Sequence, residues 1–153
     1  MLNIGIENGA RKEICSLLSH VLADTYSIFL KTQNFHWNIT GKPFYAWHVM
    51  FEKQYEELFE AIDEIAERIR SLGGHPEGSF ESLLKQSSIK GEQHILSAEE
   101  MLERLAADHE TLIRSIRKGI PMVEKAQDGA TADMLNKRLA EHEKTAWMLR
   151  SSL

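Results

Sequence analysis

The chain has few of the features that mark secreted or membrane-bound proteins. It contains one cysteine in 153 residues, Cys15, so no disulfide can form within the chain. A single thiol fits the reducing conditions of a cytoplasm. No apolar run approaches the length of about 18 residues that a membrane span needs, and the first residues lack the basic and apolar regions of a signal peptide. We therefore expect a cytoplasmic protein with no membrane partner.

Positive charge and proline are also scarce. Lysine and arginine number 18 against 23 acidic residues, which gives a net charge of −5. This balance argues against a surface built to embrace nucleic acid. Only three prolines interrupt the chain, and 42% of its residues are apolar. These values predict one compact domain with a sizeable core.

The longest uninterrupted pattern lies between Pro43 and the Gly73-Gly74 pair, so start and stop signals frame residues 44–72. Apolar residues recur there at alternating spacings of four and three, which is typical of the buried face of one long amphipathic helix. They are Phe51, Tyr55, Leu58, Ile62, Ile65, Ile69 and Leu72.

Similar periods predict three further long helices. A flexible arm over residues 1–8 precedes a first helix over 9–38, and the domain proper covers residues 9–153. A long crossover over 79–96, with a short helix near its start, follows the central helix. Ser97-Ala98-Glu99-Glu100 is a capping box that opens the third helix.

Glycine and proline interrupt the second half of the chain. Gly119 and Pro121 are expected to bend or break the third helix before it resumes to about Ala126. Asp128-Gly129 then makes a turn before a final helix. The prediction is an all-α fold, a ferritin-like four-helix bundle with a long crossover between its second and third long helices.

A second stripe runs along the central helix beside the apolar one. His48, Glu52, Asp63 and Glu67 fall within an arc of roughly 100°. The pairs 48/67 and 52/63 have the same midpoint, 57.5. If a second copy of the helix crosses antiparallel there, near Leu58, His48 meets Glu67 of the other copy and Glu52 meets its Asp63, as a two-fold axis allows. Imidazole with several carboxylates suits iron or a similar first-row ion.

Three stretches carry a resemblance to a known family. Residues 34–41 read Asn-Phe-His-Trp-Asn-Ile-Thr-Gly, residues 62–68 read Ile-Asp-Glu-Ile-Ala-Glu-Arg, and residues 141–150 read Glu-His-Glu-Lys-Thr-Ala-Trp-Met-Leu-Arg. Together with His48 they resemble the Dps family of mini-ferritins, from about residue 8 to the end of the chain.

The resemblance implies a hollow dodecamer of four-helix subunits. Such a cage oxidises ferrous iron at its dimer interfaces, favours hydrogen peroxide as oxidant and stores the ferric mineral, which protects the cell and its DNA. The family's ligand set corresponds to His36, His48, Asp63 and Glu67. The family often has aspartate where this chain has Glu52, so metal affinity or the occupancy of a second iron is open to change.

A metal site inside each bundle is the rival arrangement. It needs Glu-x-x-His on two of the helices, and no glutamate of the central helix or of residues 97–150 has histidine three places later. His109 and His142 fall on apolar lines, which favours a core or interface role. Trp37 and Trp47 flank the two candidate histidine ligands, either as seam-filling apolar residues or as oxidisable aromatics.

Acidic residues elsewhere have two interpretations. Glu124, Asp128 and Asp133 lie where channels that admit iron are found in the family, but Asp128 is also placed to cap a helix. A row at Glu56, Glu57, Glu60 and Glu64 would suit mineral nucleation if it faced inward.

The alternative function is a nucleoid protein that coats DNA nonspecifically. That activity usually relies on a lysine-rich tail, and the first twelve residues offer only Arg11 and Lys12. DNA binding is therefore expected to be weak or absent.

Overall fold

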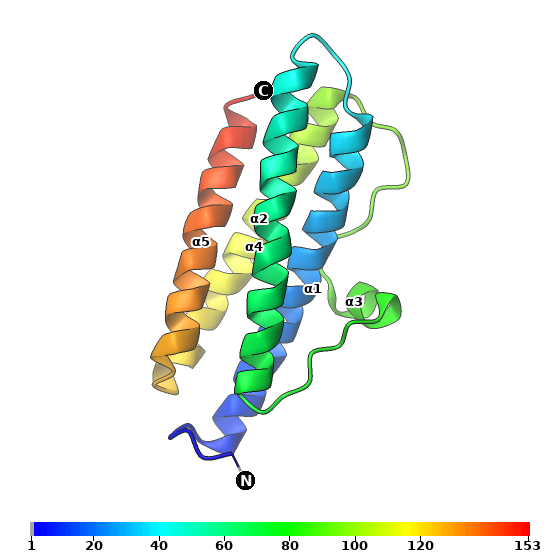
Figure 1. The fold of residues 1–153 in the computed structure, drawn as a ribbon. Coiled ribbons are helices and arrows are strands. Elements are labelled where there is room, and N and C mark those ends of the chain that lie inside the picture. Colours follow the sequence, from blue (N-terminus) through cyan, green and yellow to red (C-terminus); the bar gives the residue numbers. More distant parts are fainter. Residues whose placement is uncertain (1) are drawn as a thin grey trace.

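A computed structural model describes residues 2–153, which fold into five α-helices with no strand among them (Figure 1). Four long helices form a bundle, and a short one packs against the first of them. None of the helices in this range is long and apolar enough to cross a membrane. The all-α bundle with a helical crossover is confirmed. Its helices are α1 (Asn8–Asn38), α2 (Phe44–Ser71), α3 (Phe80–Gln86), α4 (Ala98–Lys125) and α5 (Gly129–Arg150).

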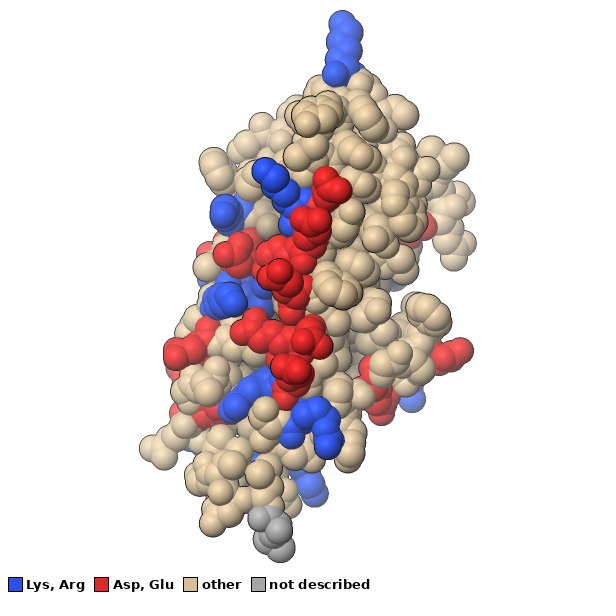
Figure 2. All heavy atoms as spheres, viewed as in Figure 1, with Lys and Arg blue, Asp and Glu red and all other residues tan. Residues whose placement is uncertain are grey.

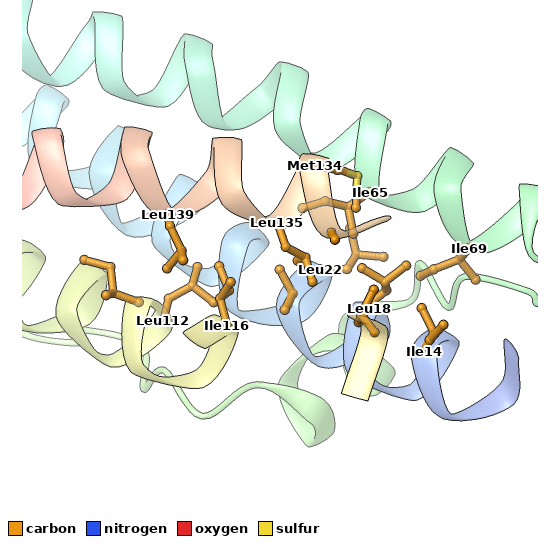
Figure 3. Close-up of a cluster of buried hydrophobic side chains, with 14 of the residues drawn as sticks. Ile14, Leu18, Leu22, Ile65, Ile69, Leu112, Ile116, Met134, Leu135 and Leu139 are labelled. Carbon is orange, nitrogen blue, oxygen red and sulfur yellow. The ribbon is translucent and has the colours of Figure 1, made fainter. Parts of the chain in front are cut away.

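Two apolar clusters make the core. The larger draws on all four long helices, with Leu18 of α1, Ile65 of α2 and Leu135 of α5 among its members (Figure 3). The smaller lies around Phe35 and Phe51. The predicted apolar face of α2 is confirmed, since five of its seven residues are buried and the other two are partly buried.

Leu58 corrects one expectation. Its side chain is 1% exposed and belongs to the larger cluster of its own bundle, so it cannot lie on a seam with another chain. The spacing alone does not show whether Leu58, next to the midpoint of the second stripe, faces the core of its own bundle or a second chain.

Helix starts follow the predicted capping chemistry. Ser97 Oγ accepts a hydrogen bond from the Glu100 amide at 3.3 Å, and the Glu100 carboxylate accepts one from the Ser97 amide at 2.8 Å. Asp128 caps α5 by accepting from the Thr131 amide at 3.0 Å. Each cap satisfies N–H groups that the first turn of a helix leaves without partners.

The expected break in α4 is wrong, whereas a bend at Gly119 and Pro121 stays a prediction. The helix runs unbroken through Gly119 and Pro121 to Lys125. Val123, beyond the proline, is fully buried, and its burial stabilises the last turn. Gly119 has a packing role instead: a Cβ there would lie 2.6 Å from the methyl groups of Leu17, so glycine permits the close approach of α1 and α4.

A buried carboxylate fixes the crossover that follows α3. Asp24 is fully buried on α1 and accepts hydrogen bonds from the Ser88 amide at 2.6 Å, the Ser88 hydroxyl at 2.7 Å and the Ser87 hydroxyl at 2.9 Å. These bonds satisfy a charge that would otherwise be costly to bury. They hold the return segment onto the bundle.

Candidate metal centre

His36, in the last turn of α1, and His48, near the start of α2, come together. Their rings stack with centroids 3.7 Å apart and planes 14° apart. The Nδ1 atom of His36 lies 2.8 Å from the His48 carbonyl oxygen, and Nδ1 of His48 lies 2.8 Å from the His36 carbonyl oxygen. Because carbonyl oxygens only accept hydrogen bonds, both rings carry a proton on Nδ1. Both Nε2 atoms are left free to bind a metal.

The end of α1 explains this arrangement. The last carbonyl groups of a helix have no partner within it, and α1 ends at Asn38, so the His36 carbonyl is open to the ring of His48. Phe44 stacks on His48 with centroids 5.0 Å apart, and Tyr55 meets His36 edge-on at 5.2 Å. The two imidazoles are thus held on both sides in a fixed orientation.

The structure does not bring all five predicted ligands together. Glu52 lies one turn beyond His48 and is partly exposed, whereas Asp63 and Glu67 are exposed further along α2. Glu67 is 19 residues from His48, about 28 Å along the helix. Within residues 2–153 no three His, Cys, Asp or Glu side chains lie close enough to hold a metal ion. One chain therefore presents two histidines at one end of a stripe and two carboxylates at the other.

Exposed aromatic residues occupy the middle of this stripe. Phe59 is 65% exposed, and its ring centroid lies 6.1 Å from that of Phe29, which also contacts Tyr55 at 6.2 Å. Tyr26 extends the cluster along α1, at 5.8 Å from Phe29. Phe29, Tyr55 and Phe59 line a depression of about 460 Å³ together with Gln33, Glu56 and Glu60. An exposed apolar patch of this kind is typical of a protein–protein contact.

The two tryptophans differ in their surroundings. Trp37 is 62% exposed, whereas Trp47 packs against the smaller apolar cluster. Trp47 therefore has the apolar packing role within its own chain. Trp37 is free to fill a seam or to meet an oxidant.

Asp128 has the structural role. It is 2% exposed and accepts hydrogen bonds from Thr131 and, at 2.7 Å, from Arg68. Burial would raise the pKa of Asp128, but the bonds from Thr131 and Arg68 outweigh it and hold the pKa below its ordinary value. Glu124 and Asp133 are exposed and remain candidates for a channel.

A band of acidic side chains runs over α2 (Figure 2). Glu56, Glu60 and Glu64 are exposed there, whereas Glu57 is partly buried by an ion pair with Arg138. Like charges gathered on one face raise the local concentration of cations. Three of the four residues of the predicted row therefore face away from the bundle core.

A second histidine pair lies inside the bundle. His109 of α4 and His142 of α5 are each 1% exposed, with their Nδ1 atoms 2.8 Å apart. Burial, with a smaller contribution from Arg138, lowers the pKa of His109 to about 3. Burial, His109 and Arg138 lower that of His142 well below its usual value. The predicted core location is confirmed, but sequence reasoning missed that the two residues are partners, because 33 residues separate them.

Comparison with known proteins decides the family. The ferritin-like domain model matches residues 15–153. The "DNA protection during starvation protein 2" of Bacillus anthracis is 37% identical over 142 residues, which cover 93% of this chain and 97% of that protein. The chain belongs to the Dps family.

Two further comparisons cover nearly the whole of this chain. The crystal structure of the Dps protein of Vibrio cholerae superposes with a TM-score of 0.94 at 29% identity, covering 99% of this chain and 95% of that one. An uncharacterised low-temperature-induced protein of Nostoc sp. is 42% identical over 154 residues, 98% of this chain and 85% of that protein. These matches span the segments of this chain that carry the histidine pair and the stripe on α2.

Proposed function

We propose that this Dps-family protein oxidises ferrous iron at sites shared between two copies of the chain and stores the ferric product in a cage of twelve subunits. The observation that carries the proposal is the orientation of His36 and His48, whose Nε2 atoms are both free beside the stripe of carboxylates. The Vibrio cholerae relative is described as a member of the "ferritin-like diiron-carboxylate proteins", which supports iron as the metal.

Symmetry supports the sharing of sites. If two α2 helices cross antiparallel with their axis at 57.5, His48 meets Glu67 of the second copy and Glu52 meets its Asp63. The exposed ring of Phe59 lies close to this midpoint, where it replaces Leu58 as the apolar contact. Each pair of chains then has two equivalent sites on either side of an aromatic centre.

The residues divide the chemistry between them. Neutral imidazoles and carboxylates hold iron, the substrate, in geometry and charge suited to both of its oxidation states. With hydrogen peroxide as oxidant, two ferrous ions each lose one electron, the O–O bond breaks, and two protons are taken up to give two water molecules. Removing ferrous iron and peroxide together suppresses formation of hydroxyl radicals. The protein would in this way protect the cell and its DNA.

Direct DNA coating is the weaker candidate. The relatives' name refers to DNA protection, but the few cations near the N-terminus of this chain are not all free. Arg11 donates to the Leu2 carbonyl at 3.3 Å and to Asn8 at 3.4 Å. A gel shift with plasmid at low salt should show weak retardation or none, since neutralised phosphates supply nonspecific affinity. Strong retardation would favour the alternative.

Subunit mixing tests the shared site. His48→Ala and Glu67→Ala should each oxidise iron poorly, because each lacks a ligand at every site. After subunit exchange in an equal mixture, about one quarter of all sites combine a native His48 with a native Glu67. Oxidation should recover to roughly that fraction of the native rate.

A matched mixture gives the control. His36→Ala and His48→Ala remove ligands from the same half of the site, so every site in their mixture lacks one histidine and activity should stay low. Failure of the first mixture to recover, with exchange confirmed by mass spectrometry, would show that the ligands do not come from two chains.

A further inference from the structure

A polar layer separates the two apolar clusters of the bundle. In α1 the clusters part between Ile28 and Phe35, where Thr32 is buried, and in α2 between Phe51 and Leu58, where Gln54 is buried. His109 takes this position in α4, between Ala106 and Leu112. His142 of α5 lies between Leu139 and Ala146 of the larger cluster, and its ring contacts that of His109. Buried polar side chains of α1, α2 and α4 therefore lie where the two clusters part, and His142 of α5 adjoins them through His109.

The hydrogen bonds around His109 and His142 fix which ring nitrogen of each histidine carries the proton. Arg138 Nη2 lies 3.2 Å from His142 Nε2, and an arginine can only donate, so His142 Nε2 accepts. The proton of neutral His142 is then on Nδ1, which donates to His109 Nδ1 at 2.8 Å. His109 must consequently carry its own proton on Nε2. Glu57, Arg138, His142 and His109 thus form a chain of hydrogen bonds, which we call the relay. It begins at the partly exposed Glu57 carboxylate, which binds both terminal nitrogens of Arg138.

The relay ends without an acceptor. His109 Nε2 is buried and has no hydrogen-bond partner among residues 2–153, and neither has the amide nitrogen or oxygen of Gln54. An unpaired buried polar group costs roughly 1–3 kcal/mol. Such groups are normally satisfied by an enclosed molecule that forms several hydrogen bonds with them.

A groove leads to the edge of this layer. It lies between α2 and α5 and has a volume of about 540 Å³; Gln54 and Glu57 both line it. Glu57 is also the residue that binds Arg138. Gln54 of the polar layer therefore borders a groove that is open to solvent.

We propose that the polar layer is a binding site for a small neutral molecule that accepts a hydrogen bond from His109 Nε2, with water as its ordinary occupant, and that the layer excludes divalent cations. The exclusion follows from charge and from proton positions. The Arg138 guanidinium lies against His142, and it uses the lone pair of His142 Nε2 that a metal would need. Both imidazole Nδ1 atoms are engaged with each other. Ligand-binding chemistry inside the bundle is thereby separated from the metal chemistry proposed for its surface.

Crystallography of the assembled protein at about 1.5 Å or better tests the site directly. Crystals at pH 7 should show an electron-density peak within about 3.2 Å of His109 Nε2. In crystals soaked with zinc ions as the probe, that peak should give no anomalous signal at the zinc edge. No peak beside Nε2, or a peak with a zinc signal, would overturn the proposal.

Substitution gives a second measurement. His109→Phe keeps a ring of similar size but removes the donor, so the peak should disappear; a peak that stays at full occupancy contradicts the assignment. Nitrogen-15 NMR of wild-type protein labelled on histidine does not depend on a variant folding. It should report the Nδ1-protonated form for His142 and the Nε2-protonated form for His109, and the reverse pattern would also overturn the relay.

Discussion

The two histidine pairs show how one residue type serves opposite purposes. His36 and His48 lie side by side at a helix junction, with Nδ1 atoms bonded to backbone carbonyls and Nε2 atoms free. His109 and His142 lie inside the bundle with Nδ1 atoms bonded to each other and Arg138 against the outer nitrogen. The free lone pairs of the first pair favour a metal, whereas the neighbouring cation of the second disfavours one. The two pairs differ in which ring nitrogen already has a hydrogen-bond partner, and this difference separates the proposed ligand pair from the structural pair.

The largest expected effect comes from replacing one histidine of each pair by alanine. His48→Ala should slow iron oxidation by about a hundredfold or more and change the free energy of unfolding little. His142→Ala should instead cost about 2–5 kcal/mol of stability, because it removes the buried hydrogen bonds that His142 makes with His109 and Arg138. Oxidation rates per folded assembly and denaturant midpoints for both variants distinguish the two outcomes. Equal loss of rate in both would refute the division of roles.

Neighbouring residues of α2 sharpen the contrast between surface and interior. Phe59→Arg should release small species on a sizing column, because it places two like charges near the proposed axis. Leu58→Ala should keep the large assembly and lose about 2–5 kcal/mol of stability to a core cavity. A large assembly that persists in the Phe59→Arg variant would remove residue 59 from the seam.

Acid should destabilise the folded protein, because the buried His109 binds a proton less readily in the folded state than in the unfolded chain. Burial holds the pKa of His109 at about 3 in the folded state against 6.5 for the unbound side chain. The unfolded chain therefore takes up the proton first, and stability should fall as the pH drops from 6.5 towards 3. The slope approaches about 1.4 kcal/mol per pH unit for this residue, or roughly 2 kcal/mol by pH 5.

Denaturant unfolding of the Phe59→Arg variant, which removes the contribution of assembly, measures this slope. Adding His109→Phe should reduce the slope by up to about 1.4 kcal/mol per pH unit, which is the contribution of one proton. Replacing the exposed His75 by alanine should leave the slope unchanged. A slope that is insensitive to His109 would show that this residue is not buried in its neutral form.

Glu52 should give the smallest effect. Glu52→Asp introduces the shorter carboxylate that the family resemblance led us to expect at this position, and it moves the carboxylate by one methylene group. The oxidation rate should change by less than about tenfold, whereas Glu52→Gln, which removes the charge, should have the larger effect. A rate unaffected by either change would exclude Glu52 from the site.

Much of the fold was predictable because its signals are local. The apolar period placed α2 to within a residue, and Ser97 with Glu100 placed the start of α4. Pro121 misled because tertiary packing, here the burial of Val123, outweighs local helix preference. For the candidate site, the pairing of His36 with His48 could be expected from the family motif. The reciprocal bonds to the backbone depend on a turn geometry that no spacing reveals.

Those reciprocal bonds have a consequence for the five residues 39–43 between the two helices. Each ring donates a hydrogen bond to the backbone carbonyl of the other histidine, so the turn is closed before any metal binds. A preorganised turn has little conformational entropy left to lose when a metal binds. Crystals with and without iron should therefore show this turn in the same place and with similar displacement factors. Alanine at His36 or His48 removes the hydrogen bond to the backbone together with the proposed metal ligand. Asparagine, whose amide can still donate to a carbonyl, would keep the hydrogen bond and remove only the imidazole ligand.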